Sequence, residues 1–268
     1  KHIVGKDCFS VESLWEEMWW HLHFIGRGGA VSFAISAVDI ALWDLKARCL
    51  NLPLWKLLGG SSNEVKAYAG GIDLQFSLGE LKKQTEGFRE QGFKAIKMKV
   101  GRQLLSDDVS RVASIRNMLG DDFPLLVDAN MGWTVDEAIV ASKALSGYGV
   151  FWLEEPTIPD DVEGHARIAS EGGIPIATGE NFHSIYDFLR FMKAEAVSFP
   201  EPDVCTVGGI TVWMKVAALA EAHNLPVTSH GVHDITVGLL AAVPNASYLE
   251  VHGFNLDPYI DKPLELRN

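Results

Sequence analysis

From residue 65 onward, short apolar runs alternate with longer segments in which apolar residues recur at helical spacing. A run of about four to eight apolar, β-branched residues is typical of a buried strand, and apolar residues three and four positions apart indicate an amphipathic helix. The predicted strands are Val65–Gly70, Ala95–Val100, Leu125–Asn130, Val150–Pro156, Pro175–Glu180, Ala196–Val204, Pro226–His230 and Ser247–His252. The predicted helices between them include Leu78–Gln91, Ser106–Leu119, Thr134–Ser146, Gly209–Ala222 and Asp234–Val243.

Strands that alternate with helices favour parallel βαβ units. Eight strands within about 190 residues indicate a closed (β/α) barrel, with an open doubly wound sheet as the alternative. The first sixty residues read differently, because Ser13–His23 and Ala30–Leu50 predict helices without intervening strands. We therefore predict a small helical piece over residues 1–60 beside a barrel over residues 61–255.

Composition narrows the classes of protein. Of 268 residues, 47% are hydrophobic and 22% charged, which is typical of a globular protein. The formal charge of −12 argues against nucleic acid or an anionic membrane surface as a partner. The longest apolar run, Ala30–Trp43, is too short for a membrane span and contains Asp39. Three scattered cysteines, Cys8, Cys49 and Cys205, predict a reducing compartment, and we expect a cytoplasmic protein.

Charged side chains recur where the predicted strands end. All strands of a parallel barrel end on one face, where the active sites of such barrels lie. A charge within an apolar strand is costly unless it is paired or coordinated, so this register indicates a functional site. The strand-end motifs, from the second predicted strand onward, are Lys97-Met98-Lys99, Asp128-Ala129-Asn130, Glu154-Glu155-Pro156, Gly179-Glu180-Asn181, Pro202-Asp203, Ser229-His230 and Leu249-Glu250.

Three of these side chains predict a metal site. Asp128, Glu154 and Glu180 follow one another at intervals of one βα unit. Converging carboxylates repel one another unless a cation lies between them. Oxygen ligands without His or Cys suit a hard divalent ion, Mg²⁺ first and Mn²⁺ second. The alternative is that each acid pairs with a basic residue at the barrel mouth.

Two further groups have the chemistry of acids and bases. Lys97 and Lys99 lie on the same side of their strand. We expect each ammonium group to lower the pKa of the other and a nearby metal ion to lower both further, so that one serves as a general base. Alternatively, one of them pairs with a metal-binding carboxylate. Asp203 beside His230 would orient the imidazole and raise its basicity. The two groups lie on roughly opposite sides of the barrel, so a substrate between them would meet Lys99 and His230 on opposite faces. We expect His233 in the first turn of a helix, without a direct role.

Taken together and in order, these motifs resemble the enolase superfamily, and within it the mandelate racemase subgroup. The segment Val38–Leu45 also resembles the helix that precedes the barrel in that family, and the resemblance covers about residues 30–252. It implies a (β/α)7β TIM-like barrel preceded by the helical part of an α+β capping domain. Residues 1–60 would be an incomplete cap, and residues 256–268 would begin the return to that cap.

The resemblance also implies roles for individual residues. Asp128, Glu154 and Glu180 would bind Mg²⁺, while Lys99 and His230, the latter with Asp203, would exchange protons with the substrate. The side chains implied to hold the substrate carboxylate or its enolate are Lys97, Asn130 and Glu250. The shared chemistry is removal of the proton α to a carboxylate of a small molecule. Members of the family commonly assemble as dimers to octamers, so we expect a homo-oligomer.

Two fates of the enolate separate the candidate activities. We favour dehydration of an acid sugar to a 2-keto-3-deoxy acid, because the residues expected near the mouth are polar. They are Tyr68, Asp73, Gln75, Asn130, Asn181, His183 and His233. The alternatives are a racemase or epimerase of a 2-hydroxy acid and a non-catalytic barrel with a structural metal. Muconate lactonization fits less well, because its second base is usually a lysine where this chain has Asp203.

Overall fold

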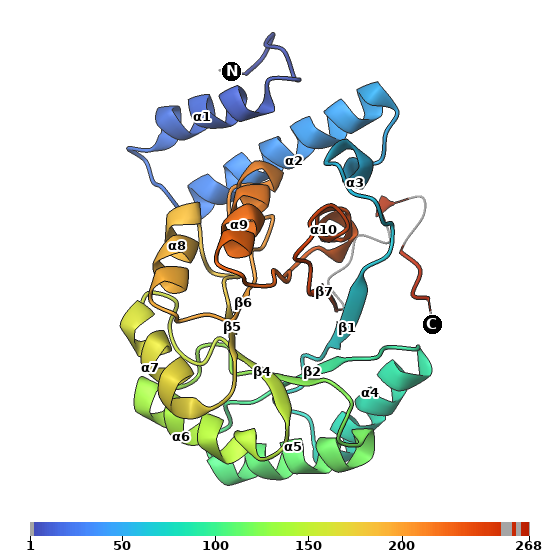
Figure 1. Cartoon of the computed structure of the whole chain (residues 1–268), viewed down its shortest axis with the longest axis vertical. Coiled ribbons are helices and arrows are strands. Elements are labelled where there is room, and N and C mark those ends of the chain that lie inside the picture. The colour runs from blue at the N-terminus through green and yellow to red at the C-terminus, as the bar shows by residue number, and fades with distance from the viewer. Residues whose placement is uncertain (1–2, 253–258, 261–263, 268) are drawn as a thin grey trace.

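The computed structural model describes residues 3–252, 259–260 and 264–267, and it shows parallel strands curled into a ring with helices outside (Figure 1). Within these residues one sheet runs in the order β6-β5-β4-β3-β2-β1-β7, and each neighbouring pair is parallel. The predicted TIM-like α/β fold is confirmed. The strands are β1 (Lys66–Gly70), β2 (Ile96–Lys99), β3 (Leu125–Asp128), β4 (Val150–Glu154), β5 (Ile176–Thr178), β6 (Phe199–Pro200) and β7 (Tyr248–Val251).

One predicted strand is wrong as a strand. Residues 226–230, the closing segment, lie between β6 and β7 and make only isolated bridges, Asp203 to His230 and Val227 to Ala246. The adjoining predicted strand over residues 196–204 shortens to the two residues of β6. Proline explains both results, because prolines at positions 200, 202 and 226 have no backbone N–H to donate to a ladder.

Helices cover the outside of the ring. The predicted helices are confirmed to within a few residues, and two of them start with capping boxes, Ser77 with Glu80 and Thr134 with Glu137. Because these caps satisfy the first N–H groups, each helix starts at a defined residue. The outer helices are α4 (Leu78–Glu90), α5 (Leu105–Leu119), α6 (Val135–Ser146), α7 (Val162–Gly172), α8 (Ile185–Lys193), α9 (Ile210–Ala222) and α10 (His233–Leu240).

Three helices precede the barrel, of which the sequence predicts the first two and not the short third. They are α1 (Val11–Leu22), α2 (Ala30–Leu50) and the short α3 (Leu54–Leu57). Figure 1 shows α1 and α2 at one end of the molecule, with α2 against α9. Among the described residues, no helix combines the length and apolar character needed to cross a membrane.

An aromatic layer fills the interior of the ring below the strand ends. It consists of Tyr68, Trp152, Phe199 and Tyr248, whose ring centroids lie 5.0 Å apart for Trp152 and Phe199 and 5.5 Å apart for Trp152 and Tyr68. Side chains two positions apart on a strand point to the same side. The layer therefore lies one step below Glu154, Glu201 and Glu250, and it forms an apolar base under the polar groups at the strand ends.

Candidate active site

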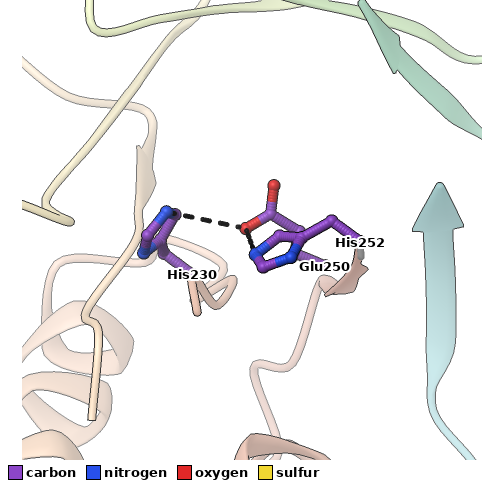
Figure 2. A group of neighbouring side chains, drawn as sticks. All are labelled: His230, Glu250 and His252. Carbon is purple, nitrogen blue, oxygen red and sulfur yellow. Dashed lines mark ion pairs between the residues drawn. The ribbon is translucent and has the colours of Figure 1, made fainter. Parts of the chain in front are cut away.

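His230, Glu250 and His252 converge at the β7 side of the barrel mouth (Figure 2). The Nε2 atoms of both histidines face Glu250 Oε2, at 3.9 Å for His230 and 3.7 Å for His252. Glu250 lies within β7, and His252 follows that strand by one residue. His252 lies two positions after Glu250, so alternation along the strand predicts that both side chains point to the same side. The sequence analysis did not identify His252.

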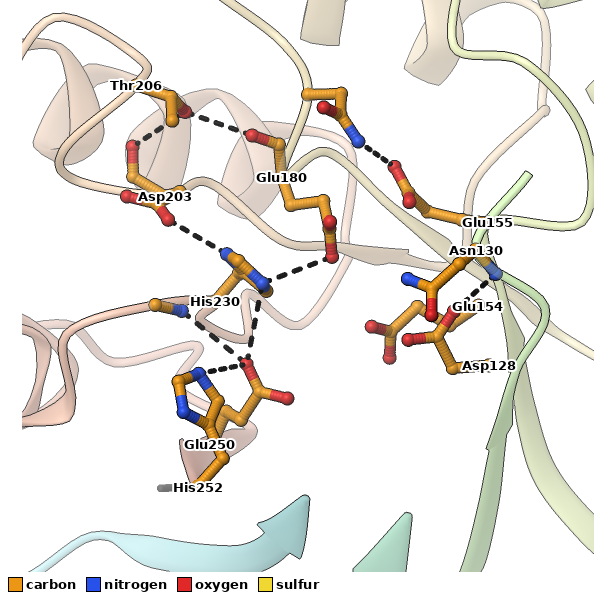
Figure 3. Close-up of polar contacts among 12 residues, drawn as sticks. Asp128, Asn130, Glu154, Glu155, Glu180, Asp203, Thr206, His230, Glu250 and His252 are labelled. Carbon is orange, nitrogen blue, oxygen red and sulfur yellow. Dashed lines mark hydrogen bonds and ion pairs between the residues drawn. The ribbon is translucent and has the colours of Figure 1, made fainter. Parts of the chain in front are cut away.

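Asp203 holds His230 from the opposite ring nitrogen (Figure 3). His230 Nδ1 lies 2.8 Å from Asp203 Oδ2, while Nε2 lies 3.2 Å from Glu180 Oε2. Burial alone would lower the pKa of His230, but the hydrogen bond to Asp203 and the surrounding carboxylate charge raise that pKa to about 10. The sequence-based expectation that Asp203 orients His230 and raises its basicity agrees with this geometry.

Three carboxylates meet beside this pair, and Glu180 lies between His230 and the carboxylates of Asp128 and Glu154 (Figure 3). Asp128 ends β3, Glu154 ends β4 and Glu180 lies two residues beyond β5. Each offers an oxygen, and these oxygens all lie within 4.8 Å of one another. Asp128 and Glu154 are completely buried, and Trp152 Nε1 donates to Glu154 Oε2 at 3.1 Å.

The two lysines of β2 lie against these carboxylates. Lys97 Nζ is 2.5 Å from Glu154 Oε1 and 2.7 Å from Glu250 Oε1, so it joins the two sides of the mouth. Lys99 Nζ is 2.5 Å from Asp128 Oδ2. Lys97 is almost completely buried, whereas Lys99 keeps 16% of its side chain exposed. Lys99 is therefore the lysine that a ligand at the mouth can reach.

The expected lowering of the lysine pKa values is wrong for these protein groups by themselves. Burial would lower the pKa of Lys97, yet the charges of Glu154 and Glu250 outweigh it and raise that pKa well above its usual value. For Lys99, burial likewise lowers the pKa, but Asp128 outweighs both burial and the repulsion from Lys97. The carboxylates contact the lysines directly, and this contact exceeds the effect of the second ammonium group.

The charge balance of the cluster fits a divalent cation. Burial raises the pKa of Glu154 well above its usual value, with Asp128 adding to the rise and Lys97 opposing it. The cluster therefore needs more positive charge than its own side chains supply. The carboxylates at the mouth outnumber the cationic groups that contact them, Lys97, Lys99 and His230, so a divalent cation would favour the charged forms of these carboxylates. The carboxylates are Asp128, Glu154, Glu180, Asp203 and Glu250.

Glu250 and its two histidines also form a set of potential metal ligands. Glu250 is already neutralised by Lys97 at 2.7 Å, and this contact, after the opposing effect of burial, holds the pKa of Glu250 far below its usual value. The raised pKa of His230 shows that this ring favours a proton. The set is therefore better suited to proton transfer than to metal binding.

Two residues expected at the mouth lie elsewhere. Tyr68 is completely buried in the aromatic layer, where Lys97 Nζ lies 5.2 Å from its ring centroid. Asp73 is also buried and accepts hydrogen bonds from the backbone N–H of Lys99 and from Arg111. Both were expected near the mouth, but Tyr68, which lies within β1, points below the site, and Asp73 supports β2.

Three other residues expected near the mouth are Asn130, His233 and Asn181. Asn130 is exposed beside Asp128, to which its backbone N–H donates at 2.8 Å. His233 begins α10, as expected, and is buried. Asn181 Nδ2 donates to Glu155 Oε1 at 2.6 Å, and burial raises the pKa of Glu155 to about 8.

Two further acids at the mouth are buried: Glu155, which belongs to the strand-end motif of residues 154–156, and Glu201, which sequence reasoning missed. Glu201 is 1% exposed, and neither carboxylate oxygen has a hydrogen-bond partner among the described residues. Burial raises the pKa of Glu201 well above its usual value, and Glu154 adds to the rise. Glu201 lies two residues before Asp203, so alternation along the strand indicates that both side chains point into the barrel.

Two protein-family models match the sequence. A family model described as "Enolase C-terminal domain-like" matches residues 80–268. A second, described as "Mandelate racemase / muconate lactonizing enzyme, N-terminal domain", matches residues 1–59.

Individual relatives agree with these matches. The chain is 55% identical to 3,6-anhydro-alpha-L-galactonate cycloisomerase of Streptomyces coelicolor, over 98% of this chain and 73% of that protein. It is 36% identical to L-talarate/galactarate dehydratase of Salmonella typhimurium, over 100% of this chain and 67% of that protein. The crystal structure of L-talarate dehydratase from Polaromonas sp. JS666, complexed with Mg and L-glucarate, superposes with a TM-score of 0.94 at 35% identity. The match covers 99% of this chain and 74% of that one.

Proposed function

This chain belongs to the mandelate racemase/muconate lactonizing enzyme family of the enolase superfamily, and from that premise we propose that it catalyses a β-elimination on an acid sugar. The observation that carries the proposal is the placement of Lys99 and of the His230–Asp203 pair on opposite sides of one carboxylate cluster. Such a pair can remove a proton on one side of a substrate and deliver a proton on the other.

Asp128, Glu154 and Glu180 would hold Mg²⁺, the ion present in the related dehydratase structure. When bound, that ion supplies positive charge that favours loss of the proton α to the substrate carboxylate. Lys97, joined to Glu154 and Glu250, adds fixed positive charge at the base of the site. Asn130 and Glu250 complete the set proposed to hold the substrate.

Lys99 and His230 act on opposite faces of the substrate in the proposed reaction. A divalent cation on Asp128 would offset the carboxylate charge that raises the pKa of Lys99, and would so favour the neutral amine. In that neutral form Lys99 Nζ takes the α-proton, and the electron pair of that C–H bond forms the double bond to the β-carbon. The bond between the β-carbon and its oxygen breaks, and His230 gives its Nε2 proton to that oxygen. Asp203 stabilises the imidazolium before this transfer through the contact at Nδ1. The enol product then takes a proton at the former β-carbon to give a 2-keto-3-deoxy acid.

The nature of the leaving oxygen separates two activities. If the oxygen belongs to a ring ether, it stays attached to the sugar, and the reaction is a cycloisomerization. If it is a hydroxyl group, water leaves, and the reaction is a dehydration. We propose the cycloisomerization of a 3,6-anhydro sugar acid first, because the 55% identical relative carries that name. Dehydration is the second candidate, supported by the 36% identical relative and by the Polaromonas structure.

Mass spectrometry and NMR test both candidates in one experiment. The protein is incubated with Mg²⁺ in D₂O and either 3,6-anhydro-L-galactonate, galactarate or a mandelate-like 2-hydroxy acid. Cycloisomerization gives a keto acid with no loss of water and one deuterium at the new methylene carbon. Loss of water from galactarate would select dehydration instead. Deuterium at the α-carbon with inversion and no bond cleavage would replace both with a racemase or epimerase.

A non-catalytic barrel remains the outcome if no substrate reacts. In that case calorimetry must show Mg²⁺ binding, so that a lack of turnover is separated from an unloaded site. Assembly into dimers to octamers stays a prediction, which light scattering tests.

A further inference from the structure

The loop between β6 and α9, residues 201–209, is held from outside the barrel by the N-terminal helices. Trp15 Nε1 donates to the backbone oxygen of Gly208 at 2.7 Å, and Ser36 Oγ accepts from the backbone N–H of Gly208 at 3.0 Å. Trp15 comes from α1 and Ser36 from α2, and Ser36 is buried. The backbone N–H and the backbone oxygen of Gly208 are thus both bound by helices that precede the barrel.

The first turn of α9 receives its cap from α2. Gly209, at the N-cap position, has no side chain to accept a hydrogen bond from the free N–H groups of this turn. Asp39 supplies the missing cap. Its Oδ2 accepts from the Thr211 backbone N–H at 2.9 Å, and its Oδ1 accepts from Thr211 Oγ1 at 2.6 Å. Trp43, one turn further along α2, donates to the same hydroxyl group at 2.9 Å.

The contact leaves no room for a side chain at Gly209. A Cβ atom there would lie 2.4 Å from Asp39 Oδ2, and the residue has a φ of +87°. Asp39 itself is completely buried. A buried carboxylate that fits a glycine of positive φ is a specific contact between the two parts of the chain.

The same loop carries the groups that hold His230. Asp203 accepts, at its backbone oxygen, from the backbone N–H of Val207 at 2.9 Å, while Thr206 Oγ1 donates to the backbone oxygen of Glu180 at 2.9 Å (Figure 3). Five residues after Asp203, the chain reaches Gly208, the peptide position that α1 and α2 bind. A shift of that peptide would therefore move the Asp203 carboxylate and, with it, the imidazole.

We propose that Asp39 is a positioning residue for the His230–Asp203 pair, and that it acts through the cap of α9 and the Gly208–Gly209 turn. The acid that gives His230 its orientation is thereby controlled by the helices that precede the barrel. The kinetic part of the test rests on the proposed β-elimination, whereas the spectroscopic part does not.

The experiment compares variants of the full protein by NMR. Asp39→Ala removes the cap, and Thr211→Val removes the hydroxyl group while keeping the shape of the side chain. Thr211→Ser keeps the hydroxyl group and serves as the conservative rescue. Asp44→Asn is the matched control on α2, because Asp44 is exposed and pairs only locally with Arg48. With histidine labelled with ¹⁵N, the Nδ1–H resonance of His230 reports its hydrogen bond to Asp203 without any substrate.

We expect Asp39→Ala and Thr211→Val to shift or broaden that resonance, and Thr211→Ser and Asp44→Asn to leave it unchanged. With substrate, the first two variants should lower kcat for elimination by about tenfold or more, as loss of a supporting hydrogen bond does elsewhere. Exchange of the α-proton through Lys99 should continue at the wild-type rate.

One result would overturn the proposal. If the resonance and the ratio of elimination to exchange both stay at wild-type values while the melting temperature falls, Asp39 is a helix cap alone. If Asp39→Ala does not fold, the Thr211 pair gives the same decision. If no substrate reacts, the proposed function fails, but the resonance still decides the positioning role.

Discussion

Replacement of Lys97 by methionine tests whether the buried charges at the strand ends act as one network. Methionine keeps the length of the side chain and removes the charge that Glu154 and Glu250 share at 2.5 and 2.7 Å. Removal of one partner from a buried ion pair costs about 3–5 kcal/mol, because the other charge is left uncompensated. For 268 residues, an unfolding entropy of about 2.1 cal/mol/K per residue converts about 4 kcal/mol into about 7 °C.

The pH dependence of this loss has a defined sign. Burial would raise the pKa of Glu250, but the charge of Lys97 outweighs burial and holds that pKa far below its ordinary value of 4.5. A group with a lowered pKa in the folded state contributes stability above its unfolded pKa and loses it as the pH falls. The difference between wild type and Lys97→Met should therefore be complete at pH 7 and should narrow as the pH falls below about 4.5.

Calorimetric and urea unfolding of both proteins with EDTA measure the difference. Lys143→Met on the exposed side of α6 is the matched control, with an expected change within about 0.5 kcal/mol. A loss below about 1 kcal/mol for Lys97→Met, or a difference that does not change with pH, would refute the reasoning. It would mean that Glu154 and Glu250 do not depend on Lys97 for their charge.

Three further changes test other parts of the site. Glu154→Gln removes one of three clustered carboxylates, so calorimetry should show Mg²⁺ affinity reduced by about tenfold or more; an unchanged affinity would reassign this ligand. His230→Asn should abolish elimination but keep deuterium exchange at the α-carbon through Lys99, as read by proton NMR, and loss of both would contradict the two-face assignment. Burial raises the pKa of Asp39 from 3.8 to about 6, so its stabilising contribution is complete below pH 3.8 and is lost as the pH rises through 6. Urea unfolding of Asp39→Asn against wild type should show this difference between pH 4 and 7, and parallel curves would contradict it.

Much of the site could be predicted because the sequence pattern indicates where the strands end. Alternation within β2 places Lys97 and Lys99 on one side, and the structure brings both to the carboxylates. The regular spacing of Asp128, Glu154 and Glu180 likewise follows from one βα unit per residue, and their oxygens do meet. These inferences needed only strand parity and the parallel direction of the strands.

Other features depended on distances that no pattern supplies. The pKa values of the two lysines are set by contacts at 2.5–2.7 Å with carboxylates from other strands, and these outweigh the neighbouring ammonium group in the motif. The closing segment reads as a strand by composition, yet the prolines around it limit its ladder to isolated bridges. Glu201 was missed because a lone acid within the predicted strand over residues 196–204 belongs to no motif, although it is almost completely buried in the fold.

The closing segment has a consequence for how activities diversify on this scaffold. Because His230 is attached to its neighbours by isolated bridges and a side-chain contact, its position is not fixed by a full ladder of backbone hydrogen bonds. Lys99, by contrast, belongs to a strand paired residue by residue with β3. Substitutions in loops can therefore move His230, the proposed acid, while Lys99, the proposed base, stays in register. Within a lineage of such barrels, the leaving group could change from hydroxyl to ether by small steps that leave proton abstraction intact.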